Sequence, residues 1–204
     1  MSVSKIFTIN VEGITPILFN NEQAMVTIPK KDRKESYPDH EQAYWLHKAH
    51  LNSKDECYIS SMWIFKTLIT SQKTDNVPIK PSSATRAKAT LQNTFVSCAY
   101  CDDAIVYKDD RMTTPVMKDD LVQFAKGVNR GTYSAPKKVI VVRPMTPGQS
   151  WYSKFTVTST DNSITKEHIE EIFEWSGLRN GMGDWRPQRG GRNGMYRLLN
   201  VVEG

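Results

Sequence analysis

The sequence has little of what disulfide scaffolds and metal centres require. Its 204 residues include three cysteines, an odd number, and no signal peptide precedes them, so we expect no disulfide framework and a cytoplasmic location. Cys98 and Cys101 have the spacing of a metal or redox pair, but a second pair is missing and the histidines are far away in sequence. We therefore expect no metal site and two small buried cysteines within a strand.

Long apolar runs and cofactor motifs are also missing. No stretch approaches the ~20 apolar residues that cross a bilayer, so the sequence predicts a soluble protein without a membrane partner. No nucleotide-binding fingerprint follows an expected strand, and no small-molecule motif stands out. The sequence therefore indicates no cofactor.

Positive charge is present in excess and is clustered. The formal net charge is +5 and the isoelectric point is about 9.0, which favours an anionic partner. A basic run contains Lys30, Lys31, Arg33 and Lys34, whereas acidic pairs occupy residues 102–120. Surfaces of opposite sign would suit a subunit that meets copies of itself.

The richest functional signal lies near the C-terminus. Residues 177–202 hold six of the eleven glycines and five arginines, with a single acid. Glycines such as Gly181 and Gly183 let a backbone adopt positive φ and approach a ligand closely. Guanidinium groups suit phosphate oxygens and also stack on bases. Trp185 is expected either to stack on a base or, as we favour, to pin the loop to its own domain, with Asp184 accepting backbone amides.

Apolar periodicity and turn residues predict the elements. Strands are expected over residues 5–19 (bending at Gly13 and Pro16), 57–59, 95–107, 137–143, 151–158 and 195–202. Helices are expected over residues 40–51 with Asp39 as the cap, from Ser60 or Ser61 to Leu68, and from the Thr165 cap to Gly177 as the residue after the end. The strands at 137–143 and 151–158 are expected to form a hairpin.

This order matches βαββαβ and predicts an α+β fold with a ferredoxin-like or RRM-like core, insertions and a C-terminal glycine-rich loop. One layer of helices would cover one face of the sheet and leave the other face and the loop for a ligand. Polar, proline-containing segments at about residues 20–40 and 74–92 are expected to project from a single domain spanning residues 1–204.

Two motifs resemble the RAMP proteins of CRISPR systems. These RRM-like proteins carry a glycine-rich loop before the last strand, matched here by Gly181-Met-Gly183 and the later glycines 190, 191 and 194, and an opening strand and turn matched by residues 9–18. Residues 181–187, Gly-Met-Gly-Asp-Trp-Arg-Pro, look most similar to uncharacterised bacteriophage RAMP-like proteins. The backbone subunit of CRISPR surveillance complexes is a more distant likeness. It implies guide-RNA binding, CRISPR-complex partners and a bacterial host cell.

Our favoured hypothesis is a non-catalytic, weakly sequence-selective binder of single-stranded nucleic acid, RNA rather than DNA, that assembles along its ligand as an oligomer or filament. The candidate contact residues are Lys30, Lys31, Arg33, Lys34, Arg86, Lys88, Gly181, Gly183, Arg186, Arg189 and Arg192.

Two alternatives remain open. A RAMP-type endoribonuclease would move protons with a histidine, and His47 or His50 is the weak candidate. A phage protein that interacts with or mimics a CRISPR-complex subunit would instead use aromatic anchors at an interface.

Overall fold

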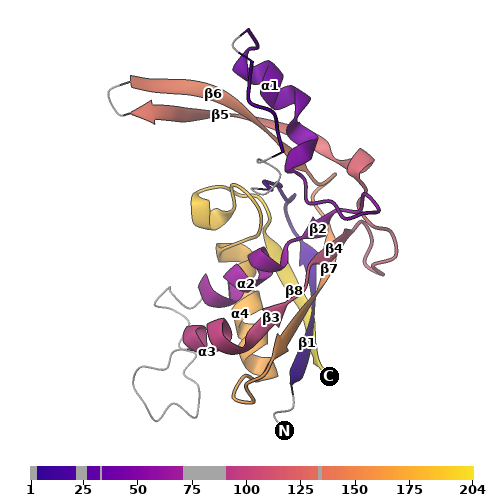
Figure 1. Ribbon diagram of the computed structural model, residues 1–204. Coiled ribbons are helices and arrows are strands. Elements are labelled where there is room, and N and C mark those ends of the chain that lie inside the picture. Colours follow the sequence, from indigo (N-terminus) through magenta and orange to yellow (C-terminus); the bar gives the residue numbers. More distant parts are fainter. Residues whose placement is uncertain (1–3, 22–26, 33, 71–90, 133–134) are drawn as a thin grey trace.

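A six-stranded antiparallel sheet forms the centre of the computed structural model, which describes residues 4–21, 27–32, 34–70, 91–132 and 135–204 (Figure 1). Its strands are β1 (Lys5–Gly13), β2 (Tyr58–Ile59), β3 (Ala99–Cys101), β4 (Ala104–Tyr107), β7 (Tyr152–Ser159) and β8 (Tyr196–Glu203). The order is β2-β4-β7-β1-β8, and β3 also pairs with β7. The central strand β1 therefore joins strands from the last third of the chain.

The connections give the sheet its ferredoxin-like topology. Along the chain, the helix α2 (Ser61–Thr70) lies between β1 and the successive strands β3 and β4, and α4 (Lys166–Arg179) lies between β7 and β8. Each strand of the core pairs antiparallel with its neighbours, β1 with both β7 and β8. The predicted α+β class and βαββαβ core are confirmed, and β2 extends the edge beyond β4.

Helices α2, α3 (Leu91–Cys98) and α4 cover one face of this sheet (Figure 1). Alternation along β1 points Phe7, Ile9 and Val11 into the core, where each is fully buried. The predicted end of the last helix at Gly177 is wrong, because α4 continues to Arg179. A Cβ on Gly177 would lie 2.2 Å from the carbonyl oxygen of Tyr196, so this glycine lets α4 approach β8. The glycine just after the helix end, which the sequence placed at Gly177, is Gly181, with a φ of +61°.

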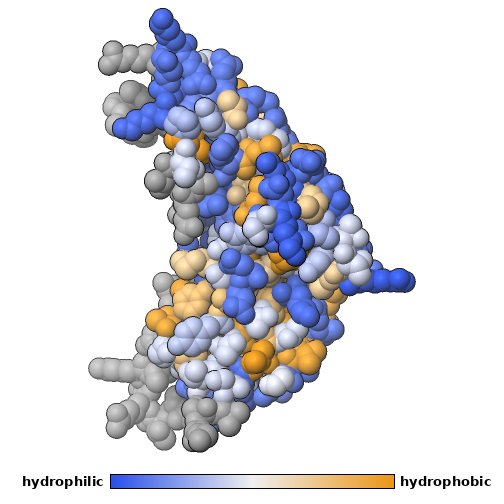
Figure 2. Space-filling model, turned by 45° about the vertical axis from the view of Figure 1, so that its right-hand side comes forward, coloured by the Kyte–Doolittle hydropathy of each residue, from blue (hydrophilic) through white to orange (hydrophobic). Residues whose placement is uncertain are grey.

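The opposite sheet face carries polar side chains that bind one another across strands. Asn10 donates to Asn200 at 2.7 Å, and the Nε of Arg197 donates to Glu12 at 2.6 Å. The space-filling view shows a mosaic of hydrophilic and hydrophobic patches over a crescent-shaped molecule (Figure 2). We call the face of β1 and β8 that carries Asn10 and Arg197 the open sheet face.

A second, two-stranded sheet stands apart from the first (Figure 1). It consists of β5 (Val122–Thr132) and β6 (Ala135–Met145), which pair along their whole length. The predicted hairpin between residues 137–143 and 151–158 is therefore wrong. β7 pairs instead with β1 over eight residues and buries Phe155 and Val157 in the core, while the turn after β6 carries the chain from one sheet to the other.

Four other local predictions have mixed outcomes. The strand at 57–59 and the following helix are confirmed as β2 and α2. The helix predicted over 40–51 is wrong: α1 (Tyr37–Ala43) begins earlier, because Ser36 caps it by accepting from the Asp39 amide, and a 3₁₀ turn over Trp45–Lys48 replaces its second half. The strand predicted over 95–107 begins as α3, since Phe95 and Cys98, three residues apart, are both buried on one helical side.

The predicted insertions are only partly visible. The first ends in α1, which packs on β6 rather than on the central sheet (Figure 1). Of the second, residues 74–90 lie outside the described residues, and the single-domain assignment stays a prediction. No helix among the described residues is both long and apolar enough to cross a membrane.

Candidate functional site

The glycine-rich loop after α4 is held against the turn that follows β1. The Met182 amide donates to the carbonyl of Gly194 at 2.9 Å, and the Gly194 amide donates to the carbonyl of Pro16 at 2.8 Å. The Asp184 amide donates to the carbonyl of Leu18 at 2.8 Å. The loop is therefore a folded element with a defined backbone, and both matched motifs of the sequence meet in it.

Gly183 has the positive φ that the sequence predicted, at +84°. A Cβ at this position would also lie 2.6 Å from the carbonyl oxygen of Leu18. Gly183 is thus needed for the close approach of the loop to residue 18.

Trp185 pins the loop, as favoured from the sequence. Its ring packs edge-on against Phe124 of β5 with centroids 5.6 Å apart, and the Nζ of Lys126 lies 4.3 Å from its centroid. Asp184 accepts one backbone amide, that of Trp185, at 3.0 Å. It also accepts from the Nε of Arg143 on β6 at 3.1 Å. The loop is therefore attached to the two-stranded sheet as well as to the central one.

Buried charges connect this attachment to α1. Lys48, 3% exposed, donates to Glu41 at 2.5 Å, and Glu41 also accepts from the Val142 amide at 3.0 Å. Burial alone would raise the pKa of the Glu41 carboxyl, but the bonds from Lys48 and Val142 and the nearby charge of Arg143 hold it below its usual value. The result is an ionised, fully bonded network at the base of β6.

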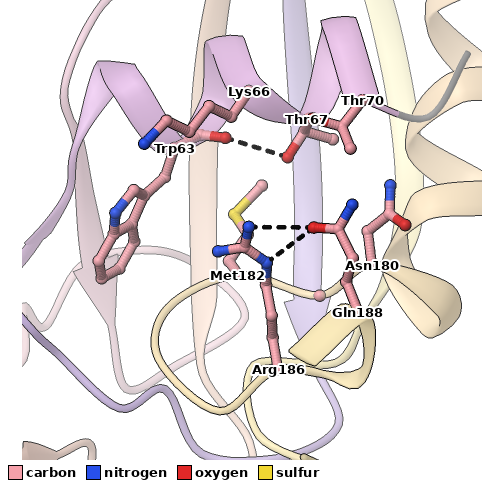
Figure 3. Close-up of a pocket in the computed structure, with 9 residues that line it drawn as sticks. Trp63, Lys66, Thr67, Thr70, Asn180, Met182, Arg186 and Gln188 are labelled. Atoms are coloured by element: carbon pink, nitrogen blue, oxygen red, sulfur yellow. Dashed lines mark hydrogen bonds between the residues drawn. The ribbon is translucent and has the colours of Figure 1, made fainter. Parts of the chain in front are cut away.

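A groove lies between α2 and the glycine-rich loop. Its larger hollow, of about 390 Å³, is lined by Asn20, Trp63, Lys66, Gly183, Asp184, Trp185, Arg186 and Arg189. A second hollow, of about 160 Å³, shares Asn20, Trp63 and Lys66 with it and extends to His50 and Tyr58. We call the two together the α2–loop groove. Figure 3 shows Trp63 and Lys66 of α2 across from Arg186 and Gln188 of the loop.

The arginines of the loop differ in setting. Arg186 is half-buried and donates to the carbonyl of Gly183 at 3.2 Å and to Gln188 at 3.0 Å, so its guanidinium has a fixed orientation. Burial, and then the charge of Arg189, lower the pKa of Arg186. Arg189 is exposed and lines the larger hollow, whereas Arg192 is exposed and lines neither hollow of the groove. Gly181 lines a smaller hollow beside Trp63.

The basic run of the first insertion lies elsewhere. Lys30 and Lys31 line a separate hollow of about 220 Å³ next to α1, and the Nζ of Lys31 donates to the carbonyl of Glu35 at 2.5 Å. Lys34 is exposed. The other three cationic candidates, Arg33, Arg86 and Lys88, lie outside the described residues. The structure thus gathers Gly183, Arg186 and Arg189 into one groove and does not add the basic run of the first insertion to it.

The two candidate histidines have different surroundings. His47 is exposed, and its ring lies 5.6 Å from that of Tyr44. His50 is 6% exposed, and burial lowers its pKa to about 4, opposed by the charge of Asp103. At neutral pH its imidazole is therefore uncharged and does not serve as a general acid.

Sequence analysis did not identify Asn20, Trp63 and Lys66, the three residues shared by both hollows. Trp63 contacts the core, and its remaining surface faces the groove. The available signal was the spacing of Trp63 and Lys66, three residues apart on an expected helix and so on one side of it.

The cysteines do not form a pair. Cys98 ends α3 and Cys101 lies in β3, so only the latter is in a strand as predicted. Burial raises the pKa of both thiols, that of Cys101 to about 12. Among the residues described, no three His, Cys, Asp or Glu side chains are grouped as metal ligands.

The depressed pKa of His50 predicts a stability change with pH. The unfolded chain takes up the proton near the ordinary pKa of 6.5 while the folded protein resists it until about 4. Unfolding free energy should therefore fall as pH falls through this interval, by up to about 3 kcal/mol. Urea unfolding of His50→Phe and of the wild type between pH 7 and pH 4 isolates the contribution of His50 to this pH dependence, because the variant has no imidazole at this position. Parallel profiles for the two proteins would contradict the assignment.

Comparison with known proteins identifies the fold. The sequence matches no protein-family model and no curated protein sequence. Among solved structures, the chain is similar to one in the cryo-EM structure of the Type III-B Cmr-beta complex bound to cognate target RNA, with a TM-score of 0.57 and 10% identity over 98% of this chain and 60% of the other. The chain therefore shares the fold of this neighbour. It spans about three-fifths of that neighbour's length.

A second solved structure, the crystal structure of Cmr6 from Pyrococcus furiosus, has a TM-score of 0.46 and 10% identity over 96% of this chain and 98% of the other. At the 10% identity of the Cmr-beta match, the likeness concerns the fold alone. The groove and its residues are therefore argued from this chain itself.

Proposed function

We propose that the protein binds single-stranded nucleic acid, RNA rather than DNA, in the α2–loop groove and without catalysis. The observation that carries this proposal is the convergence of Lys66, Arg186 and Arg189 with Trp63 and Trp185 around one hollow. Cations that follow a backbone, with aromatic rings beside them, are what single strands require of a binding surface.

The groove has two kinds of cationic side chain, one held by hydrogen bonds and two exposed. Arg186 is held by Gly183 and Gln188, which gives its guanidinium one orientation toward a phosphate. Lys66 and Arg189 are exposed and act as screened charges on neighbouring phosphates. Contacts of this kind carry no base identity, so affinity should depend strongly on salt and only weakly on sequence.

The groove is a better candidate than the open sheet face. There, the charged group of Arg197 is already bound by Glu12 and the amides of Asn10 and Asn200 are bound to each other. The RNA in the structure of the Cmr-beta neighbour supports RNA as the ligand class. Assembly of a homo-oligomer along the strand, CRISPR-complex proteins as partners and a cytoplasmic location are further parts of this proposal.

Salt-dependent binding tests the proposal. In fluorescence anisotropy with a labelled mixed-sequence RNA, Lys66→Gln and Arg189→Gln should each weaken binding about three- to tenfold and reduce the slope of log affinity against log salt by about 0.7, the value for one lost phosphate contact on a single strand. Lys154→Gln, at an exposed position of β7, is the matched control and should change neither quantity.

Equal losses in all three variants would show that the groove is not the binding surface. If the wild-type protein binds no single-stranded RNA or DNA at low salt, nucleic-acid binding itself is refuted. If the protein cleaves the RNA, the absence of catalysis is refuted. Cleavage that persists in His50→Phe and His47→Ala would show that neither histidine is the catalytic residue.

A further inference from the structure

The second hollow of the groove has a character of its own. It continues from the shared residues Asn20, Trp63 and Lys66 away from the glycine-rich loop and ends at His50 and Tyr58. Its volume is about 160 Å³. We call it the His50 hollow. It has no cation besides Lys66 among its lining residues, so phosphate binding does not explain it.

Two buried polar atoms of this hollow lack hydrogen-bond partners within the described part of the chain. They are the Nδ1 of His50, a residue 6% exposed, and the Oδ1 of Asn20. Folded proteins bond nearly all such atoms, so those left over need an explanation, and a bound group is one. Both residues line the same hollow, so one ligand placed there could bond both atoms once the two side chains turn toward it.

The walls of the hollow are aromatic. The ring of His50 lies 4.6 Å from that of Trp63 and 5.3 Å from that of Tyr58, and Phe19 backs Trp63 at 6.2 Å. Aromatic side chains with polar atoms beside them suit a planar heteroaromatic ring that carries hydrogen-bonding groups on its rim. Nucleobases are rings of this kind, and the hollow adjoins the cationic part of the groove.

We propose that the His50 hollow receives one base of the bound strand, specifically a base with an exocyclic amino group. This inference rests on the proposed function and adds a base preference to it at one position. The amino group donates to the Oδ1 of Asn20, which can only accept, and a ring nitrogen meets the Nδ1 of His50. A neutral imidazole can donate or accept at that atom, according to its tautomer. Trp63 stacks beside the base while Lys66 holds a flanking phosphate.

Adenine presents a suitable amino edge, whereas uracil has no exocyclic amino group and leaves the Asn20 oxygen without that donor. The preference should therefore separate adenine and cytosine from uracil. A single hydrogen-bonded contact of this type discriminates by about tenfold.

The test uses labelled uridine decamers with one central adenosine, one central cytidine, an abasic site or uridine alone. Wild-type protein should bind the adenosine and cytidine strands about tenfold tighter than the all-uridine and abasic strands. In Asn20→Leu, which keeps the side-chain size and removes the acceptor, and in His50→Phe, which keeps the ring, the preference should drop below about twofold. Asn200→Leu, at an exposed position of β8, should keep the preference.

The outcomes separate the inference from the function beneath it. RNA binding without a base preference in the wild type, or a preference that survives both substitutions, overturns the inference and leaves the groove intact. Absence of RNA binding overturns both. If either variant fails to fold, 2-aminopurine at the central position of the RNA gives a second measurement on wild-type protein. Stacking beside Trp63 should quench the fluorescence of the 2-aminopurine when the RNA binds. Unchanged 2-aminopurine fluorescence would place the base outside the hollow.

Discussion

Replacing Gly194 by alanine is expected to lower the free energy of unfolding by about 3 kcal/mol or more. Two costs coincide at this position. Its φ of +66° is unfavourable for a residue with a Cβ, and that Cβ would lie 1.7 Å from the carbonyl oxygen of Met182. The obstructing atom belongs to the backbone of Met182, whose amide also donates to the Gly194 carbonyl. The two backbone segments must therefore separate to make room for the Cβ.

Gly190 offers a matched control in the same loop. Its φ is +75°, but a Cβ there would meet nothing within 4 Å. Gly190→Ala should therefore cost only the backbone term, about 1 kcal/mol. Urea unfolding of the two variants and wild type measures the difference. Equal costs for both substitutions would show that the loop is looser than the contact of Gly194 with Met182 implies.

Replacing Glu41 by leucine should be the other strongly destabilising change, by about 3–5 kcal/mol, because it removes the carboxylate that pairs with the buried ammonium of Lys48. Lys48 is 3% exposed and donates to Glu41 at 2.5 Å, so solvent cannot take the place of the lost carboxylate. The affected region is the base of β6, where Arg143 holds Asp184 of the glycine-rich loop.

The double variant Glu41→Leu, Lys48→Met distinguishes a buried charge from lost packing. Removing both charges should restore most of the stability, since the buried ammonium is removed together with its carboxylate and Arg143 keeps its pair with Asp184. Unfolding midpoints of the two single variants and the double variant complete the cycle. A double variant as unstable as Glu41→Leu would mean that the carboxylate acts chiefly through the Val142 amide, from which it accepts at 3.0 Å.

Local signals were the predictable part of this fold. Residues 7–12 alternate between apolar and polar side chains, Thr165 caps the last helix, and Gly183 adopts the positive φ expected of it. Each depends on chemistry within a few residues, namely a period of two, a hydroxyl that accepts an amide, and a missing Cβ. The order of these elements was then sufficient for the α+β class and the ferredoxin-like core.

Pairing between distant segments was not predictable in the same way. The strand at 137–143 was assigned to its neighbour in sequence, but β5 supplies its partner and β7 pairs with β1. Both arrangements satisfy the local pattern, and burial of Phe155 under the helices decides between them only in three dimensions. The α2–loop groove was missed for a related reason. Trp63 has the large apolar side chain of a typical core residue. Only the position of the loop in the folded protein shows that part of this side chain faces a hollow.

Cross-linking tests most directly whether nucleic acid lies in the α2–loop groove. RNA that contains 4-thiouridine at every second position is irradiated in complex with the protein, and the attached peptides are identified by mass spectrometry. We expect cross-links in the segment with Tyr58, Trp63 and Lys66 and in the loop from Gly183 to Arg189. Cross-links confined to the strands of the open sheet face, at Tyr152 or near Asn200 and Arg197, would contradict the account.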